Sequence, residues 1–346
     1  MEKSISNLSS VTTVGVDLAK LVFAVHCVDA SGRVIVAKAM KRKSLLAFFS
    51  ALPPCLVGLE ACGSAHHWAR ELIKLGHDAR IMPPAYVKPY VRRQKNDAAD
   101  AAAICEAVTR PSMRFVSVRT LENQATLMHH KVREMLVSQR TQLLNGLRGH
   151  LSEIGMIAAQ GPRYARELAE RIEASDETIP LPVCEALAPL VVQLRNLDEA
   201  IARLDRTIAK MAHKDETARR LMTIPGIGPI TVSAMVASVQ DASGFSGPRE
   251  FAAFLGLTPR QNSSGGKQRL GRISKMGNRY LRKLLVVGAH AVLYHRKPHT
   301  DALRMWAKKL IEKKPFKLVA VALANKMARI AFAVLRARTS YNAIAA

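Results

Sequence analysis

The stretch VTTVGVDLAKLVFAVHCVDASGRVIVAKAM, residues 11–40, decides the fold of the first part of the chain. It opens with a β-branched run that ends at Asp17, and two further β-rich runs follow, one on each side of the sequence Asp29-Ala30-Ser31-Gly32. Val, Ile, Thr and Phe suit a pleated, half-buried strand, whereas Asp, Ser and Gly mark a turn. The stretch therefore predicts a strand followed by a β-hairpin.

The segments that follow alternate between helix and strand patterns. KSLLAFFSAL (43–52) is typical of a helix, and CLVGLEA (55–61) is typical of a short buried strand. HHWARELIKLG (66–76) has the spacing of an amphipathic helix, and DARIMPP (78–84) predicts another strand. This order favours a mixed α/β sheet, and we expect it to form a first domain over residues 1–118.

Four carboxylates occupy the ends of these elements. Asp17 ends the first strand, Glu60 ends the strand CLVGLE, and Asp97 and Asp100 open a helix expected over about 96–108. Residues three apart share a helix face, so both helical carboxylates can point the same way. A two-metal nuclease of the ribonuclease-H-like fold needs such a set, and hard oxygen ligands suit Mg²⁺ or Mn²⁺.

Taken singly, each acid also has a simpler explanation. Asp17 and Asp97 are residue types that cap turns and helices, and Glu60 fits a solvated strand end. The constellation of all four favours the metal site over these separate readings. Three cations directly precede the helical acids and are candidates to hold the phosphates of a strand: Arg92, Arg93 and Lys95.

The charge of the chain indicates a polyanionic partner. Of its 346 residues, 52 are Lys or Arg and 27 are Asp or Glu, which gives a formal net charge of +25. A protein this basic most often binds nucleic acid. A membrane surface is the alternative, but we expect no membrane partner because the longest apolar stretches are too short or are interrupted by polar residues. The absence of an N-terminal apolar run predicts no secretory signal, and five cysteines without a CxxC motif indicate a reducing cytoplasm.

Residues 119–215 are expected to be almost entirely helical. Within CEALAPLVVQLRNLDEAIARLDRTIAKMA (184–212), leucine and isoleucine recur at steps of three or four. This spacing fits about three heptads of a coiled coil, and it fits equally a helix packed on its own domain. The recurring residues are Leu187, Leu190, Leu194, Leu197, Ile201, Leu204 and Ile208.

A third, basic and mostly helical region is expected over residues 216–346. Its segment LMTIPGIGPITVSAMVA (221–237) has the helix–hairpin–helix pattern. Glycines such as Gly226 and Gly228 let a hairpin backbone approach a phosphate, which the N-terminus of the next helix then binds. A tight helix–helix turn without a ligand is the alternative.

The segment LTPRQNSSGGKQRLGRISKMGNRYLRK (257–283) combines a flexible turn with many cations. A serine in SSGG could attack a phosphodiester while the cations stabilise the charged transition state, although SSGG is also an ordinary turn. The candidate phosphate-binding cations are Arg260, Lys267, Arg269, Arg272, Lys275, Arg279, Arg282 and Lys283.

Five blocks in this order, VGVDLAK, VGLEACG, KNDAADAAAI, IPGIG and the segment 257–283, resemble the transposases of the insertion-sequence-110 family, in particular its 1111 subgroup. The resemblance spans about residues 11–338. It implies a RuvC-like N-terminal domain that carries Asp17, Glu60, Asp97 and Asp100, a helical coiled-coil middle, and a C-terminal transposase domain.

The resemblance also implies partners and a second catalytic group. Members of the family are recombinases guided by a structured bridge RNA that pairs with target and donor DNA. Their C-terminal domain supplies a serine nucleophile, which the SG motif assigns to Ser264, with Ser263 as the neighbouring alternative. An oligomer, a homodimer or a homotetramer, follows from the same resemblance, as does a bacterial cytoplasmic, nucleoid-associated location.

Two other functions stay open on the sequence. One is a RuvC-like nuclease, such as a junction resolvase, that uses water and needs no serine. The other is a non-catalytic protein that binds RNA or DNA through the helix–hairpin–helix and the basic helices.

Overall fold

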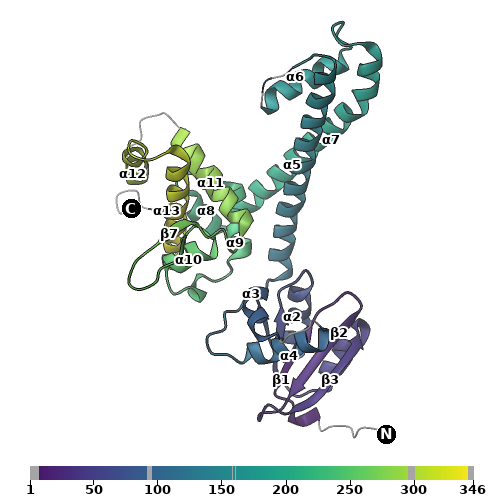
Figure 1. Ribbon diagram of the computed structural model, residues 1–346, viewed down its shortest axis with the longest axis vertical. Coiled ribbons are helices and arrows are strands. Elements are labelled where there is room, and N and C mark those ends of the chain that lie inside the picture. Colours follow the sequence, from purple (N-terminus) through teal and green to yellow (C-terminus); the bar gives the residue numbers. More distant parts are fainter. Residues whose placement is uncertain (1–7, 92–95, 158, 160, 295–300, 342–346) are drawn as a thin grey trace. The chain divides into compact units, whose positions relative to one another are not determined.

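The computed structural model describes residues 8–91, 96–157, 159, 161–294 and 301–341 (Figure 1). The chain divides into two compact units, 1–121 and 122–346. The helical middle and the basic C-terminal region expected from the sequence both fall within the second unit.

The first unit contains the predicted mixed α/β sheet. Its five strands lie in the order β3-β2-β1-β4-β5. The hairpin strands β2 and β3 are antiparallel to each other and β2 is antiparallel to β1, whereas β1, β4 and β5 run parallel. The strands are β1 (Thr13–Asp17), β2 (Val22–Val28), β3 (Val34–Lys41), β4 (Leu56–Glu60) and β5 (Asp78–Met82).

Helices cover both faces of this sheet. One face packs against α4 (Asp97–Val108), which crosses β1, β2 and β4. The other face buries Trp68 of α2 (Ala65–Lys74) edge-on against Phe23 of β2, with ring centroids 5.2 Å apart. The remaining short elements of the unit are η1 (Leu8–Ser10), η2 (Arg42–Ser44), α1 (Leu45–Ser50), α3 (Pro84–Val87) and η3 (Lys88–Tyr90).

Two glycines let α4 lie directly on the sheet. A Cβ atom at Gly15 of β1 would lie 2.4 Å from the backbone nitrogen of Cys105, and one at Gly58 of β4 would lie 2.9 Å from Cβ of Val108. Real Cβ contacts are not this short, so both positions require glycine. Because alternate strand residues share a face, this contact also determines which side chains at the strand ends face α4.

The second unit is mostly helical, with one small hairpin. Its helices are α5 (Leu121–Glu153, which begins one residue before the unit), α6 (Pro162–Glu173), α7 (Leu181–Lys214), α8 (Glu216–Met222), α9 (Pro229–Ser238), η4 (Ala242–Gly244), α10 (Pro248–Phe254), α11 (Arg279–Tyr294), α12 (Ala302–Ile311) and α13 (Phe316–Ala337). The hairpin strands are β6 (Pro259–Gln261) and β7 (Leu270–Ile273), and they pair antiparallel.

The long helices α5 and α7 run antiparallel within this unit (Figure 1). Arg133 of α5 pairs with Asp205 of α7. Further toward the C-terminal end of α5, Arg140 pairs with Asp198 of α7 at 3.0 Å. Most of the periodic α7 stripe is buried inside the same unit: Leu187, Leu194, Leu197, Ile201 and Ile208 are each no more than 8% exposed. The stripe is therefore buried by packing inside this unit.

Helix α13 lies in the hydrophobic core of the second unit, where it packs against α8, α10, α11 and α12. By length and composition it is apolar enough to cross a membrane, so the expectation that the longest apolar stretches are too short or are interrupted by polar residues was wrong for this segment. Its apolar side chains are used inside the protein, however, since Val319, Leu323, Met327 and Ala331 are fully buried in the core. This helix packs as the core helix of a globular unit.

The five cysteines form no disulfide. Cys27, Cys55, Cys105 and Cys184 are buried, and Cys62 is exposed. Burial raises the pKa of Cys27 to about 12 and that of Cys105 to about 11, so these thiols are protonated packing groups.

Candidate metal centre and serine hairpin

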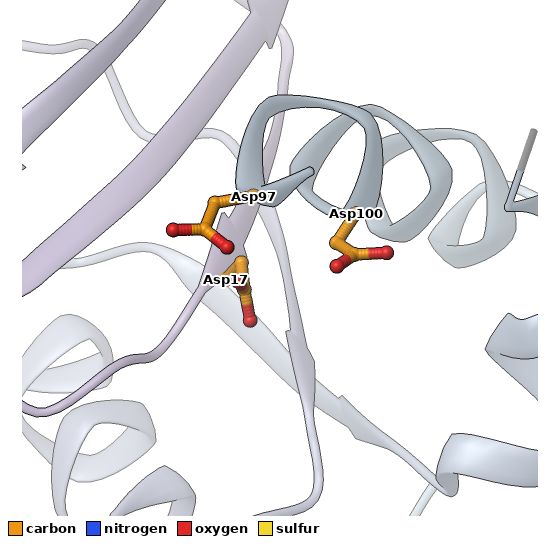
Figure 2. A group of neighbouring side chains, drawn as sticks. All are labelled: Asp17, Asp97 and Asp100. Carbon is orange, nitrogen blue, oxygen red and sulfur yellow. The ribbon is translucent and has the colours of Figure 1, made fainter. Parts of the chain in front are cut away.

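Three of the four predicted acids lie together. One carboxylate oxygen from each of Asp17, Asp97 and Asp100 lies within 4.8 Å of those of the other two. Figure 2 shows that they gather where the end of β1 meets the first turn of α4. Asp97 is exposed, and Asp17 and Asp100 are half-buried, so the group is accessible from solvent.

The start of α4 explains the position of its two acids. Asn96 is the N-cap, and its side-chain oxygen accepts a hydrogen bond from the backbone N–H of Ala99 at 2.7 Å. Asp97 therefore does not cap this helix, contrary to the simpler reading of the sequence. It stands instead in the first turn with Asp100, where the helix dipole favours negative charge.

Glu60 lies beside this group without belonging to it. Leu59 is paired with Val16 in the parallel β1–β4 ladder, so Glu60 and Asp17 end adjacent strands. Glu60 lies two residues beyond Gly58, and Asp17 lies two residues beyond Gly15. Both glycines face α4, and alternate strand residues share a face, so both acids point to the α4 side of the sheet. Among the described residues, the group whose carboxylate oxygens all lie within 4.8 Å of one another consists of the three aspartates, without Glu60.

The donor set fits a hard divalent cation. Three carboxylates this close repel one another unless a cation or protons compensate them. All three offer oxygen ligands, the type that Mg²⁺ and Mn²⁺ prefer. The predicted flanking cations Arg92, Arg93 and Lys95 lie outside the described residues.

The second predicted catalytic segment forms an exposed hairpin in the other unit. Its tip is Ser264-Gly265-Gly266-Lys267, closed by a 3.1 Å hydrogen bond from the Lys267 N–H to the Ser264 carbonyl oxygen. The φ angles of Gly265 and Gly266 are +56° and +75°, the combination of a type I′ turn. The two glycines are thus required by the turn, and they hold Ser264 at the tip.

The two serines have different environments. The Ser263 hydroxyl accepts hydrogen bonds from the Gln261 side-chain amide and from the Arg269 backbone N–H, each at 3.1 Å. The Ser264 side chain is exposed, and its hydroxyl makes no hydrogen bond with any of the described residues. Ser263 stabilises the hairpin, whereas the Ser264 hydroxyl faces solvent.

The predicted cations of this segment divide into two groups. Arg282 donates to the carbonyl oxygens of Leu255 (2.9 Å) and Met276 (3.1 Å), and Lys283 pairs with Glu134 at 3.0 Å. Arg260 reaches the carbonyl oxygen of Ser274 at 3.3 Å. The other five are exposed and make no ion pair with a described residue: Lys267, Arg269, Arg272, Lys275 and Arg279.

The SKMGN part of the motif, residues 274–278, has a structural explanation. A Cβ atom at Gly277 would lie 1.9 Å from the carbonyl oxygen of Phe254, so the turn fits tightly against the end of α10. Asn278 then caps α11, because its side-chain oxygen accepts from the Leu281 N–H at 3.1 Å. This turn joins the serine hairpin to the helical core, which explains Gly277 and Asn278 of the motif without a ligand.

Two family models match the chain, one described as "Transposase IS116/IS110/IS902 family" over residues 218–304 and one described as "Transposase" over residues 14–156. The chain is 49% identical over 334 residues to a "Probable family 20 transposase" of Pseudomonas aeruginosa, covering 96% of this chain and 99% of that protein. The chain belongs to the IS116/IS110/IS902 family of transposases. Family membership implies DNA cleavage and strand transfer.

Two further relatives of this transposase come from named insertion sequences. The transposase for element IS1111A of Coxiella burnetii is 40% identical over 336 residues, which cover 97% of this chain and 92% of the relative. The transposase for element IS1328 of Yersinia enterocolitica is 38% identical over 335 residues, which cover 97% and 100%. The resemblance to the insertion-sequence-110 family seen in the sequence blocks is confirmed.

The helix–hairpin–helix segment of the transposase comprises the end of α8, the turn that follows it and most of α9. A Cβ atom at Gly226 would lie 2.7 Å from the carbonyl oxygen of Gly288 in α11, so this glycine is required for internal packing. Gly228 is exposed, precedes α9 and has no atom within 4 Å of its Cβ position. Of the two glycines predicted to approach a phosphate, Gly228 is the one with open space around it.

Two clusters in the transposase were not predicted from its sequence. The first is the run Lys41-Arg42-Lys43 beside Trp68, whose only signal was three consecutive cations after an expected strand. The second is a buried network in which His130 contacts the hydroxyls of Tyr280 and Ser233, each at 3.1 Å. The adjacent pair His129-His130 gave no hint of these distant partners.

Proposed function

We propose that this transposase is an RNA-guided, site-specific DNA recombinase with two catalytic groups, a metal centre and a serine nucleophile. The observation that carries the metal centre is the convergence of Asp17, Asp97 and Asp100, whose carboxylate oxygens lie within 4.8 Å of one another. Glu60, which ends the neighbouring strand on the same face, is the fourth ligand of the proposed site.

The fold proposed for the first unit is RuvC-like, that is, ribonuclease-H-like. It is supported by the strand order β3-β2-β1-β4-β5, with an antiparallel hairpin joined to parallel strands and α4 across the centre. This topology brings the ends of β1 and β4 and the start of α4 to one edge. The proposed middle part is a coiled coil that includes α7, for which the three- and four-residue spacing of its leucines and isoleucines is the support.

The four acids would hold Mg²⁺ or Mn²⁺. When bound, such ions stabilise the charge that develops on the oxygens of a phosphodiester in transfer. The role of the protein is to hold the carboxylates on rigid elements: Asp17 on the sheet and Asp97 and Asp100 on a capped helix. Exposed cations of the hairpin would bind neighbouring phosphates and hold the strand in place.

Ser264 is the proposed nucleophile. Its hydroxyl oxygen would form a bond to phosphorus while the bond to one ester oxygen breaks. The serine proton would pass to solvent, and the departing DNA oxygen would take up a proton from solvent to leave as a hydroxyl. Because one phosphate ester replaces another, a second DNA hydroxyl can reverse the step and release the serine. This exchange conserves the bond needed for rejoining, which hydrolysis by water does not.

The guide RNA and the oligomer complete the proposal. A net charge of +25 supports binding of more than one nucleic-acid strand, and each phosphate neutralised on duplex DNA makes binding weaken by roughly 0.9 log unit per log unit of salt. The RNA would pair with donor and target DNA, and the acids of one subunit would act with the serine of another in a homodimer or homotetramer.

A cleavage assay with DNA containing the element junction, the RNA of the element and Mg²⁺ tests the proposal. Asp17→Asn should abolish cleavage, and wild type should leave a protein–DNA adduct that survives denaturation. Cleavage without any adduct would contradict the serine step and indicate a hydrolytic nuclease. Binding without cleavage by the wild-type protein would contradict the enzymatic role altogether.

A further inference from the structure

A groove of about 700 Å³ lies in the first unit, away from the three aspartates. It is lined by the start of β2, the end of β3 with η2, and α2. Its walls include Leu21 and Val22, which are 71% and 47% exposed. Exposed apolar side chains that border a concave surface are one of the features of a binding site.

One side of the groove is cationic. Lys41, Arg42 and Lys43 are consecutive and exposed, and none makes an ion pair with a residue that the structure describes. The guanidinium of Arg42 lies 5.0 Å from the ring centroid of Trp68 and 5.7 Å from that of Phe23. The two aromatic rings thus lie against the Arg42 guanidinium, and the residue as a whole stays exposed.

Trp68 carries a second indication of a ligand. This residue lines the groove and is only 5% exposed, and its indole N–H is buried with no hydrogen-bond partner among the described residues. A buried donor without a partner is costly, which favours a bound group that supplies an acceptor.

We propose that this groove binds one unpaired nucleotide of the DNA strand that enters the acid site; the DNA identity rests on the proposed function. The base would stack on the supported Arg42 guanidinium between the apolar walls, and Lys41 and Lys43 would hold the flanking phosphates. Arginine planes and aromatic side chains are the usual platforms for single-stranded bases, and lysine and arginine neutralise the backbone.

The position of the groove indicates that it would bind the DNA strand that enters the acid site. Lys41 ends β3 at the same edge of the sheet where Asp17 ends β1, and only β2 lies between them. With strands about 4.8 Å apart, β1 and β3 are roughly 10 Å apart across the sheet. The Arg42 N–H also donates at 2.9 Å to the carbonyl oxygen of Leu21, in the connection that follows Asp17. Trp68 covers the opposite face from α4, so the groove and the acids are separate sites along one edge.

Fluorescence of Trp68 tests the proposal in the full-length protein. The chain has two tryptophans, so in a Trp306→Phe background Trp68 is the sole reporter. Without divalent ions, a six-nucleotide oligo-dT should change its emission on binding. An abasic oligomer of equal length and charge should bind about 10-fold more weakly, since stacking one base contributes a factor of this order or more.

Variants assign the effect to the groove. Arg42→Ala should weaken oligo-dT binding about 10-fold, and Lys41→Ala with Lys43→Ala should make binding less sensitive to salt. The matched control is Lys38→Ala, because Lys38 is an exposed cation on the same strand, 4.7 Å from the Phe48 ring, but outside the groove. It should leave binding and the emission change intact.

The outcomes separate this proposal from the proposed function. Equal affinity for abasic and oligo-dT ligands, equal effects of Arg42→Ala and Lys38→Ala, or tighter binding of oligo-U than of oligo-dT would each overturn it. Those results would leave the Mg²⁺-dependent cleavage assay unaffected. Conversely, cleavage that survives Asp17→Asn would overturn the acid site while the base-dependent binding stands.

Discussion

A Cβ atom at Gly15 would lie 2.2 Å from the backbone carbonyl oxygen of Ala101. The central strand and the helix that carries Asp97 and Asp100 therefore touch through their backbones. Gly58 repeats the contact one strand away, where its Cβ would lie 3.1 Å from the carbonyl oxygen of Ile104. The position of the helical acids above Asp17 depends on these two missing side chains.

Gly15→Ala should push α4 away from the sheet. Overpacking a tight contact costs about 1–3 kcal/mol of folding free energy, and the moved helix would take its acids away from Asp17. We expect a lower midpoint of thermal unfolding and loss of Mg²⁺-dependent DNA cleavage. Gly149→Ala is the control, because Gly149 lies in α5 with no atom within 4 Å of its Cβ position, and it should be neutral or stabilising. Full cleavage by Gly15→Ala would refute the dependence on this contact.

A bound divalent ion should stabilise the first unit. Because three carboxylates share a small volume, an ion that binds only the folded state adds about 2.7 kcal/mol when its concentration is one hundred times its dissociation constant. Mn²⁺ should therefore raise the thermal midpoint of the wild-type protein. Asp97→Asn should reduce that rise, whereas Asp78→Asn, a change at an acid paired with Arg80 on β5, should preserve it. An equal rise in both variants would mean that the ion binds elsewhere.

The two adjacent serines should give different phenotypes. Ser264→Ala should abolish the covalent protein–DNA adduct, because no other hydroxyl stands at the turn tip. Ser263→Ala removes an acceptor of two hydrogen bonds, each contributing about 0.5–1.5 kcal/mol, so it should loosen the hairpin and slow adduct formation without preventing it. Denaturing gels of the labelled DNA measure both. An adduct that persists in Ser264→Ala and disappears in Ser263→Ala would reverse the assignment.

The sequence predicted the elements of the site better than its exact geometry. Residue alternation in the strands and the start of a helix near Asn96 were enough to place Asp17, Asp97 and Asp100 at one edge. The distances between the carboxylates could not be predicted from the sequence, because they depend on how closely α4 approaches the sheet. Gly15 was visible in VGVD, but nothing local showed that its missing side chain meets Ala101, 86 residues away in the chain.

The roles of single residues within a motif were harder to predict. In the basic segment the sequence treated eight cations alike, but the fold uses Arg282 to bind two carbonyl oxygens and Lys283 to pair with Glu134. Likewise Gly226 proved necessary for packing against Gly288. Such partners come from distant elements, so a local pattern can indicate a type of surface but cannot say which member of it faces solvent.

Histidine 130 should make the helical unit sensitive to acid. Burial, with smaller contributions from Arg133 and His129, lowers its pKa from an ordinary value of 6.5 to about 4. The neutral ring can donate to one hydroxyl and accept from the other, which satisfies its contacts with Tyr280 and Ser233. A charged ring could only donate, so the folded state resists protonation that the unfolded state accepts.

The sign of the effect follows from that difference. Above pH 6.5 the His130 ring is neutral in both the folded and the unfolded state, and the protein has its full stability. As the pH falls from 6.5 toward 4, His130 is protonated in the unfolded state but stays neutral in the folded state. The free energy of unfolding therefore declines by up to about 3 kcal/mol. Urea unfolding at pH 7 and pH 4.5, followed by far-UV circular dichroism, measures the loss. His130→Gln should reduce the loss between the two pH values, whereas His129→Gln, at the half-buried neighbour, should leave it near the wild-type size. Equal losses in wild type and His130→Gln would show that other groups dominate the acid sensitivity of these helices.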